Sequence, residues 1–340
     1  MMLQRPIRIA INGFGRIGRA LFRICMKDPM IEVVMINDPR LTSEDIAYLC
    51  KYDSLYGVLA DDIVSKDNSF FVNGKHVALH HVDILQTIPF YEYNIDILVQ
   101  ANGNLANLKQ QICFLEKAPF HAIFTNHVNE GHVRPFVYAT EKIEVLASLK
   151  IVSLSTCDVG AVLPVYKMLA GLYGIHSASI VTLHPYLSSQ NVLDGKSSND
   201  EVELGRSVFN TLIPKTTSLE SILKEYFPDQ RENIMAMSFR IPTNTVSNAI
   251  MNLHLQNDVE KEMLQTSLAT WCQTSCPSVG LYSKDRGVSV DYKQASQSFI
   301  IDHRWINCIK NHARISIWYD NEWGYASRVY DCLKHLSGVN

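Results

Sequence analysis

The chain has 340 residues, of which 47% are hydrophobic and 19% charged, with 16 Gly and 12 Pro. This length exceeds the size at which one hydrophobic core usually stops growing, so we expect two domains, and the composition excludes a disordered or low-complexity chain. The 31 basic and 34 acidic side chains give a formal charge of −3 without a basic stripe. We therefore expect neither nucleic acid nor a membrane surface as a partner.

The chain has no uninterrupted apolar run of membrane-spanning length and no signal-peptide core at its amino terminus, which indicates a cytoplasmic protein. Its eight cysteines are scattered and too sparse for a secreted disulfide scaffold of this length, so we expect free thiols. Cys272 and Cys276 are the closest pair, but no second pair and no histidine lies near them in the sequence. We therefore expect no metal site.

The first half of the chain has the pattern of an α/β fold. Residues 7–11 alternate and then become continuously apolar, as in an inner parallel strand, and a glycine-rich turn and a helix-like run over 18–26 follow. A second apolar strand over 31–36 ends at Asn37-Asp38-Pro39. This order favours a mostly parallel sheet with helices on its faces. The other elements predicted in this half are strands at 69–72, 76–80, 95–99 and 121–125 and a helix at 104–117.

The second half has the pattern of a separate, largely antiparallel sheet. A strand over 151–154 and a helix over 161–173 come first, and the longer alternating runs that follow are typical of antiparallel strands. We place the first domain at 1–156 and the second at 157–321, with a C-terminal helix over 322–340 docking on the first domain. The alternating runs lie at 178–184, 233–241, 246–255, 286–292, 297–303 and 313–319.

A glycine motif follows the first strand and opens the first helix: Gly13-Phe-Gly15-Arg-Ile-Gly18. In this context the first glycine makes a tight turn, the second lets the backbone approach a pyrophosphate, and the third allows close helix packing. Asp38, at the end of the next strand, is placed to accept hydrogen bonds from an adenosine ribose and to repel a 2′-phosphate. The pattern favours NAD over NADP, and the alternative is a glycine turn with an unrelated acidic loop residue.

Cys157 and His184 are the candidates for nucleophilic chemistry. Cys157 precedes a helix-like run, and a helix N-terminus lowers the pKa of a thiol. His184 ends an apolar strand, where it could act as a base toward that thiol. A dinucleotide motif together with a reactive thiol indicates oxidation of an aldehyde through a hemithioacetal and a thioester, released by water or phosphate. Alternatively, the two residues are a buried thiol and a hydrogen-bonded strand-end histidine. Arg206 and Arg240 could bind an anionic substrate group or be ordinary surface or interface arginines.

Four segments resemble the glyceraldehyde-3-phosphate dehydrogenase family, which includes the erythrose-4-phosphate dehydrogenases, and the similarity extends nearly from end to end. The segments are residues 11–19, 48–54, 239–243 and 318–325. Within the family, Tyr226-Phe-Pro-Asp229, Ser218 and the Asn-Glu-Trp-Gly form of the last segment are more typical of the erythrose branch. The resemblance implies a Rossmann-type NAD-binding domain, an α+β catalytic domain and a homotetramer.

The resemblance also implies roles for individual residues. Cys157 matches the nucleophile and His184, 27 residues later, the base. Backbone contacts to the pyrophosphate are implied for Arg16 and Ile17, a ribose contact for Asp38, a place along the cofactor cleft for Thr125, and a carboxamide contact for Asn321. The complete set implied to bind the cofactor is Asn12, Gly13, Gly15, Arg16, Ile17, Gly18, Asp38, Thr125 and Asn321. The set implied to line two anion sites for the substrate is Thr156, Arg206, Thr217 and Arg240.

The chain departs from the family around its nucleophile. Residues 156–160 read Thr-Cys-Asp-Val-Gly where the family reads Ser-Cys-Thr-Thr-Asn, so a carboxylate replaces a neutral hydroxyl. If Asp158 faced the thiolate, the repulsion would be roughly 4 kcal/mol at about 4 Å, and it would also oppose inorganic phosphate. Alternatively, Asp158 points outward and interacts with the helix dipole. Pro164 implies a kink or a later helix start, and Leu187 replaces a threonine of one anion site.

These observations predict NAD-dependent oxidation of a phosphorylated sugar aldehyde, either erythrose 4-phosphate or glyceraldehyde 3-phosphate. If Asp158 faces the thiolate, its charge argues against phosphate as the second reactant and is compatible with release of the acid by water. The alternative is a family member that keeps the fold and the cofactor site but has altered chemistry and acts as an NAD-responsive binding or regulatory protein.

Overall fold

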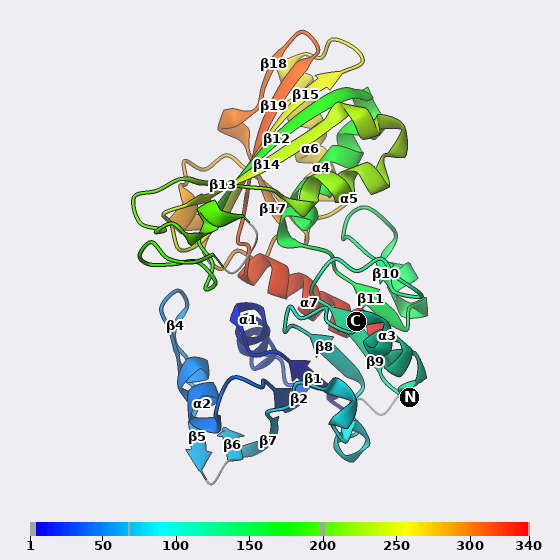
Figure 1. Cartoon of the computed structure of the whole chain (residues 1–340). Coiled ribbons are helices and arrows are strands. Elements are labelled where there is room, and N and C mark those ends of the chain that lie inside the picture. The colour runs from blue at the N-terminus through cyan, green and yellow to red at the C-terminus, as the bar shows by residue number, and fades with distance from the viewer. Residues whose placement is uncertain (1–4, 67–68, 198–200, 339–340) are drawn as a thin grey trace. The chain divides into compact units, whose positions relative to one another are not determined.

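The computed structural model describes residues 5–66, 69–197 and 201–338. The chain divides into two compact units, bounded by residues 1–136, 141–155 and 326–340 for the first and by 137–140 and 156–325 for the second. Each unit has its own large sheet (Figure 1). Among the described residues, no helix combines the length and the apolar character needed to cross a membrane.

The sheet of the first unit is mostly parallel, which confirms the predicted fold class. Its order is β10-β11-β9-β8-β1-β2-β7-β6-β5, with parallel pairing from β10 to β7 and antiparallel pairing of β7, β6 and β5. A separate two-stranded sheet pairs β3 with β4. The bounds are β1 (Ile7–Asn12), β2 (Ile31–Asn37), β3 (Tyr52–Asp53), β4 (Gly57–Val58), β5 (Ile63–Lys66), β6 (Ser69–Val72), β7 (Lys75–His80), β8 (Ile97–Gln100), β9 (His121–Phe124), β10 (Arg134–Pro135) and β11 (Ile151–Ser153).

Helix α3 and the central strands of the first unit share an apolar core. Every residue of β8 is buried, as expected of a parallel strand in the middle of a sheet. Ile112 and Leu115 of α3 pack with Leu98 of β8 and Ala122 of β9 in the same cluster. The helices of this unit are α1 (Arg16–Cys25), α2 (Ser43–Lys51), α3 (Leu108–Lys117) and the part of α7 (Trp323–Leu336) from residue 326 onward, with 3-10 turns at η1 (Leu85–Thr87), η2 (Phe90–Tyr93) and η3 (Ile143–Ser148).

Helix α3 begins at Leu108, later than the predicted start at 104. Asparagine side chains accept hydrogen bonds from the backbone amides between these two positions. Asn102 Oδ1 accepts from the amide of Asn104 at 3.1 Å, and Asn104 Oδ1 accepts from the amide of Ala106 at 2.8 Å. Asn107 then adopts a left-handed conformation with φ of 56°. Such local side-chain bonds compete with helix formation and delay it.

The second unit contains a largely antiparallel sheet, again as predicted. Its order is β13-β14-β12-β15-β19-β17-β16, and β18 pairs with β19. Within the described strands of this second sheet, the pairs β12–β14 and β16–β17 are parallel and the other pairs are antiparallel. The bounds are β12 (Ile175–Pro185), β13 (Ile213–Lys215), β14 (Ile234–Ile241), β15 (Ser247–Leu255), β16 (Gly280–Ser283), β17 (Phe299–Asp302), β18 (Asn307–Ile309) and β19 (His312–Tyr319). The helices are α4 (Cys157–Tyr173), α5 (Ser218–Tyr226) and α6 (Lys261–Thr274), with 3-10 turns at η4 (Val202–Gly205), η5 (Pro228–Asn233), η6 (Ser289–Tyr292) and η7 (His303–Trp305).

The predicted strand over 286–292 is wrong, because its second half forms the 3-10 turn η6. The carboxylate of Asp291 accepts from the backbone amide of Val288 at 2.7 Å, and the amide of Asp291 donates to the carbonyl of Val288 at 3.0 Å. Val288 and Val290, whose spacing resembled a strand, are 58% and 61% exposed. The alternation therefore reflected a capped surface turn and not a buried strand face.

Helix α4 begins at Cys157, so the predicted later start is wrong and Pro164 lies inside the helix. Thr156 caps it: its hydroxyl accepts from the amide of Val159 at 3.4 Å, and its carbonyl accepts from the amide of Gly160 at 2.9 Å. A threonine cap satisfies amides that have no partner within the helix. The cap fixes Cys157 as the first helical residue.

Candidate active site

The predicted dinucleotide motif forms the turn between β1 and α1. Gly13 has a φ of +103°, and a Cβ there would lie 2.4 Å from the backbone of Asn102. A Cβ on Gly18 would lie 2.1 Å from the carbonyl oxygen of Gly13, whereas one on Gly15 would meet no described atom within 4 Å. Only glycine fits the first and third positions, and the second leaves open space beside the backbone. This arrangement fits a bound pyrophosphate.

Two further features of this turn fit a dinucleotide. Gly15 is the N-cap of α1 and offers no side-chain bond to the first amides of the helix, an arrangement that favours an anion. Asp38 follows β2 and holds its carboxylate beside the turn, accepting from the amides of Phe14 at 2.9 Å and Arg40 at 3.0 Å. The side chain of Arg16 forms an ion pair with Asp53 at 2.5 Å. Arg16 would therefore contact a pyrophosphate through its backbone amide, as the resemblance implies.

Asn12 and Thr125, which were predicted to bind the cofactor, lie at the end of β1 and directly after β9, and the strand order β9-β8-β1-β2 runs through the middle of this sheet (Figure 1). Asn12 donates to the side chain of Gln100 and accepts from Asn37 Nδ2 at 2.7 Å. The hydroxyl of Thr125 donates to the carbonyl of Gln100 at 3.0 Å. Open α/β sheets bind ligands at the carboxyl ends of their strands. Asn37 was missed by sequence reasoning, although a polar residue ending a buried strand was a usable signal.

Asn321, in the second unit, has a buried amide oxygen that finds no hydrogen-bond partner among the described residues. An unsatisfied buried acceptor costs stability unless a ligand supplies the donor. The carboxamide group of a nicotinamide ring has such a donor, so Asn321 is suited to the role that the resemblance implies.

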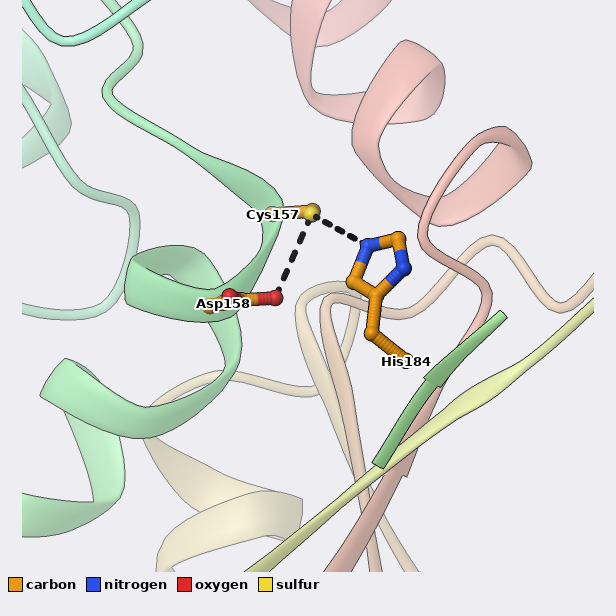
Figure 2. Close-up of side chains that lie close together, drawn as sticks. All are labelled: Cys157, Asp158 and His184. Atoms are coloured by element: carbon orange, nitrogen blue, oxygen red, sulfur yellow. Dashed lines mark hydrogen bonds between the residues drawn. The ribbon is translucent and has the colours of Figure 1, made fainter. Parts of the chain in front are cut away.

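Cys157, Asp158 and His184 form a compact cluster in the second unit. Cys157 Sγ lies 3.8 Å from His184 Nε2 and 3.5 Å from Asp158 Oδ1. Figure 2 shows the side chains of Asp158, from α4, and His184, from β12, both directed at the sulfur. The structure thus brings together the cysteine and histidine predicted as nucleophile and base.

The orientation of Asp158 settles the alternative left open by the sequence. Tyr319, near the end of β19, donates its hydroxyl to Asp158 Oδ1 at 2.9 Å and holds the carboxylate against the sulfur. The outward orientation is therefore wrong. Tyr319 was missed as a site residue by sequence reasoning, and its only signal was its place in the segment 318–325 that resembles the family.

His184 is the neutral partner of the pair. Its Nδ1 lies 2.8 Å from the carbonyl oxygen of Pro185, and because a carbonyl only accepts, Nδ1 carries the proton and the lone pair of Nε2 faces the sulfur. Burial lowers the pKa of His184 to about 4, against the opposing effect of the Asp158 charge, and Arg240 lowers it further. The imidazole is therefore neutral near pH 7 and can accept a proton.

Of the two cases that the sequence left open, the pKa of Cys157 follows the one in which Asp158 faces the thiol. Burial raises the pKa of this thiol well above its usual value, and the charge and hydrogen bond of Asp158 raise it further, while Arg240 lowers it. The helix N-terminus does not outweigh desolvation and a carboxylate at 3.5 Å. The resting pair is thus a thiol and a neutral imidazole.

The residues predicted for anion binding occupy different settings. Arg240 lies opposite His184 in the pair β12–β14, and its buried Nη1 has no partner among the described residues. Arg206 instead forms an ion pair with Asp194 at 3.0 Å, with its side chain 65% exposed. The hydroxyl of Thr217 caps α5 by accepting from an amide at 3.2 Å, as that of Thr156 caps α4. Arg240 is the one of these residues whose charge acts on both Cys157 and His184.

Comparison with known proteins agrees with this geometry. The family described as glyceraldehyde 3-phosphate dehydrogenase matches with its NAD binding domain over residues 7–108 and its C-terminal domain over 156–321. Glyceraldehyde-3-phosphate dehydrogenase 2 of Bacillus subtilis is 31% identical over 332 residues, which cover 97% of each chain. The chain belongs to the glyceraldehyde-3-phosphate dehydrogenase family.

Other relatives support the same assignment. Glyceraldehyde-3-phosphate dehydrogenase 3 of Saccharomyces cerevisiae is 29% identical over 97% of this chain and 99% of its own length. The cytosolic glyceraldehyde-3-phosphate dehydrogenase of Gracilaria gracilis is 29% identical over 97% of this chain and 98% of its own. The family resemblance and the predicted use of NAD are confirmed, and the chain is an NAD-dependent dehydrogenase of this type.

Proposed function

We propose that this dehydrogenase oxidises a phosphorylated sugar aldehyde, erythrose 4-phosphate or glyceraldehyde 3-phosphate, through Cys157 and His184. The observation that carries the proposal is the unprotonated Nε2 of His184, 3.8 Å from the sulfur. His184 takes the thiol proton as Sγ adds to the aldehyde carbon, giving a hemithioacetal on Cys157. NAD, when bound, supplies the acceptor for the hydride whose loss leaves a thioester on Cys157.

The carboxylate of Asp158 favours water over phosphate in releasing the acid. It lies 3.5 Å from the sulfur and would face any group that approaches a thioester there. An anionic phosphate meets charge repulsion at that position, whereas water does not. We therefore propose the reaction without phosphate, which agrees with the resemblance to the erythrose branch.

Arg240 is the residue we propose to bind the anionic group of the substrate. Its buried Nη1 has no protein partner in the described part of the chain, and a guanidinium can bind a phosphate through two parallel hydrogen bonds. The hydroxyls of Thr156 and Thr217 and the exposed Arg206 are proposed to complete the anion sites. Leu187, 37% exposed, offers no side-chain donor there.

The test is NADH formation with each of the two aldehydes, with and without inorganic phosphate. We expect turnover of erythrose 4-phosphate that does not depend on phosphate. Cys157→Ser should abolish turnover while leaving NAD affinity nearly unchanged, and Cys113→Ser, which alters an exposed cysteine outside the cluster, should retain it. Phosphate-dependent turnover of glyceraldehyde 3-phosphate would contradict the role given to Asp158, and turnover by Cys157→Ser would contradict the mechanism.

A second candidate function is favoured by the raised pKa of Cys157, which disfavours a reactive thiolate. In that case the protein binds NAD but acts as a binding or regulatory member of its family. NAD binding without turnover of either aldehyde, under every phosphate condition, would support this alternative over the first.

We also propose that the protein is a cytoplasmic homotetramer, as the family resemblance implies. The second unit exposes apolar side chains on its sheet, with Met235 63%, Met237 42% and Ile309 70% exposed. Exposed apolar surface of this kind is typical of contacts between subunits. Light scattering on the purified chain should give the mass of four chains, and Met235→Glu should lower it.

A further inference from the structure

We propose that Cys157, Asp158 and His184 form a binding site for a zinc ion, with three protein ligands and a fourth position open. The sulfur, a carboxylate oxygen and a ring nitrogen of these residues all lie within 4.8 Å of one another. Figure 2 shows that the carboxylate and the imidazole reach the sulfur from different elements. Thiolate, imidazole and carboxylate are the three ligand types that zinc takes in proteins.

The two separations that involve the sulfur are close to those of a tetrahedral zinc site, and the carboxylate oxygen and the ring nitrogen lie within 4.8 Å of each other. Zinc binds sulfur at about 2.3 Å and nitrogen or oxygen at about 2.0–2.2 Å, which places tetrahedral ligand atoms roughly 3.3–3.6 Å apart. Here the sulfur lies 3.8 Å from Nε2 and 3.5 Å from Oδ1. Rotation of the imidazole and the carboxylate about their side-chain bonds is the adjustment that would bring the three ligand atoms to zinc distances.

The neighbours of the three ligands are arranged as around a metal centre. His184 donates its Nδ1 proton to the carbonyl of Pro185 at 2.8 Å, which leaves Nε2 as the free ligand atom. Tyr319 donates to Asp158 at 2.9 Å and fixes the carboxylate. Metal-binding histidines and carboxylates are commonly oriented by such second hydrogen bonds.

The charges around the cluster favour a cation once the thiol is deprotonated. The ion forms a bond to sulfur and displaces the thiol proton to solvent, so two negative ligands, Cys157 and Asp158, then face it. Arg240 and Lys215 contribute positive charge near His184 and oppose the ion. Asp158, which stands where the family has a neutral hydroxyl, supplies the additional negative ligand.

Zinc at this site would stop the dehydrogenase reaction, because the metal would occupy both Sγ of the nucleophile and Nε2 of the base. The inhibition rests on the proposed function, whereas binding of the ion does not. Measurements of binding and of activity therefore separate failure of the metal site from failure of the proposed reaction.

The test is titration of the metal-free, full-length protein with Co²⁺, whose bond to a thiolate gives a charge-transfer absorption, together with equilibrium dialysis against Zn²⁺. We expect one ion per chain. Asp158→Asn keeps the size of the side chain and an oxygen for Tyr319, and should weaken binding by at least about tenfold, because loss of even an outer partner of a ligand costs about 10- to 100-fold. Cys157→Ser should abolish the charge-transfer band. Asp229→Asn and Cys113→Ser, which alter an exposed carboxylate and an exposed thiol outside the cluster, should bind as the unaltered chain does.

Wild-type affinity in Asp158→Asn would overturn the proposal, as would one bound ion without a charge-transfer band. Circular dichroism and the unfolding midpoint show whether each variant is folded. With a folded and active enzyme, Zn²⁺ should inhibit NADH formation and a chelator should restore it. Binding at the cluster with unchanged activity would contradict only the proposed roles of Cys157 and His184.

Discussion

At the scale of single residues, burial sets the protonation of the Cys157–His184 pair. Desolvation disfavours the charged form of each group, so it raises the pKa of the thiol and lowers that of the imidazole. The carboxylate of Asp158 then adds repulsion against a thiolate. The pair therefore rests in its neutral form, and His184 must take the proton during attack on the substrate and not before.

The charge of Asp158 predicts a slow reaction of Cys157 with alkylating reagents. Asp158→Asn removes the repulsion and should speed alkylation at pH 7 by about tenfold or more, since one pKa unit changes the thiolate population tenfold. The rate of iodoacetamide labelling at Cys157, followed by mass spectrometry, measures this effect. Asp229→Asn, an exposed position, is the matched control and should label as slowly as the unaltered chain. Equal rates in the two variants would exclude the proposed repulsion.

The lowered pKa of His184 predicts loss of stability in acid. Between pH 6.5 and about 4 the unfolded chain binds a proton at this residue and the folded chain does not. The free energy of unfolding should therefore fall as the pH decreases through this window, by up to about 3 kcal/mol from this group. His184→Asn, which cannot titrate, should show a shallower decrease. Urea unfolding at pH 7, 5.5 and 4.5 tests this, and parallel curves would contradict it.

At the scale of elements, α4 presents the nucleophile. Its cap at Thr156 fixes Cys157 as the first helical residue, while two residues unfavourable in a helix interior, Gly160 and Pro164, follow within two turns. The helix persists because every residue of the run 159–166 except Gly160 is buried. These seven side chains, Pro164 among them, pack within the second unit. Packing therefore outweighs propensity in positioning Cys157.

Gly160 offers a stability test for this helix. A Cβ at this position meets no described atom within 4 Å, so Gly160→Ala should raise the free energy of unfolding by about 0.5–1 kcal/mol. Gly174→Ala is the opposite control, because Gly174 has a φ of +62° and its Cβ would lie 2.4 Å from the side chain of Gln256. Chemical denaturation of both variants measures the effects. A destabilised Gly160→Ala would show that this position cannot accommodate a side chain.

At the scale of the whole molecule, the two units divide the chemistry between them. The first holds the glycine turn and Asp38, and the second holds Cys157 and His184. The end of the chain returns to the first unit, where Tyr330 donates to Asp28 at 2.7 Å. The first unit is thus built from both ends of the chain.

Because the site for NAD exists only in the folded chain, we expect NAD to raise the free energy of unfolding. At a concentration 100 times its dissociation constant, a ligand of the folded state adds about 2.7 kcal/mol. NADP at the same concentration should add less, because its 2′-phosphate would face the carboxylate of Asp38. Thermal unfolding with each dinucleotide measures the difference. Asp38→Asn should reduce it, and equal stabilisation by both dinucleotides in the unaltered chain would contradict the role of Asp38.

Much of the architecture could be predicted because it depends on local sequence. The alternation of apolar residues, the glycine motif after a strand and the strand ending at Asn37 each need only neighbouring residues, so the α/β first half and its use of NAD followed from the sequence. The strand predicted at 286–292 failed because Asp291 closes a turn through its side chain, which periodicity does not register.

The chemistry around the sulfur was decided by tertiary structure. The sequence showed that Cys157, Asp158 and His184 are present, and the family resemblance assigned the cysteine and the histidine. The sequence could not determine where the carboxylate of Asp158 points, because Tyr319, 161 residues away, holds that carboxylate through a hydrogen bond. Nor could it determine the direction of the pKa shift of Cys157, since desolvation depends on everything that packs around the sulfur and not on its neighbours in the chain.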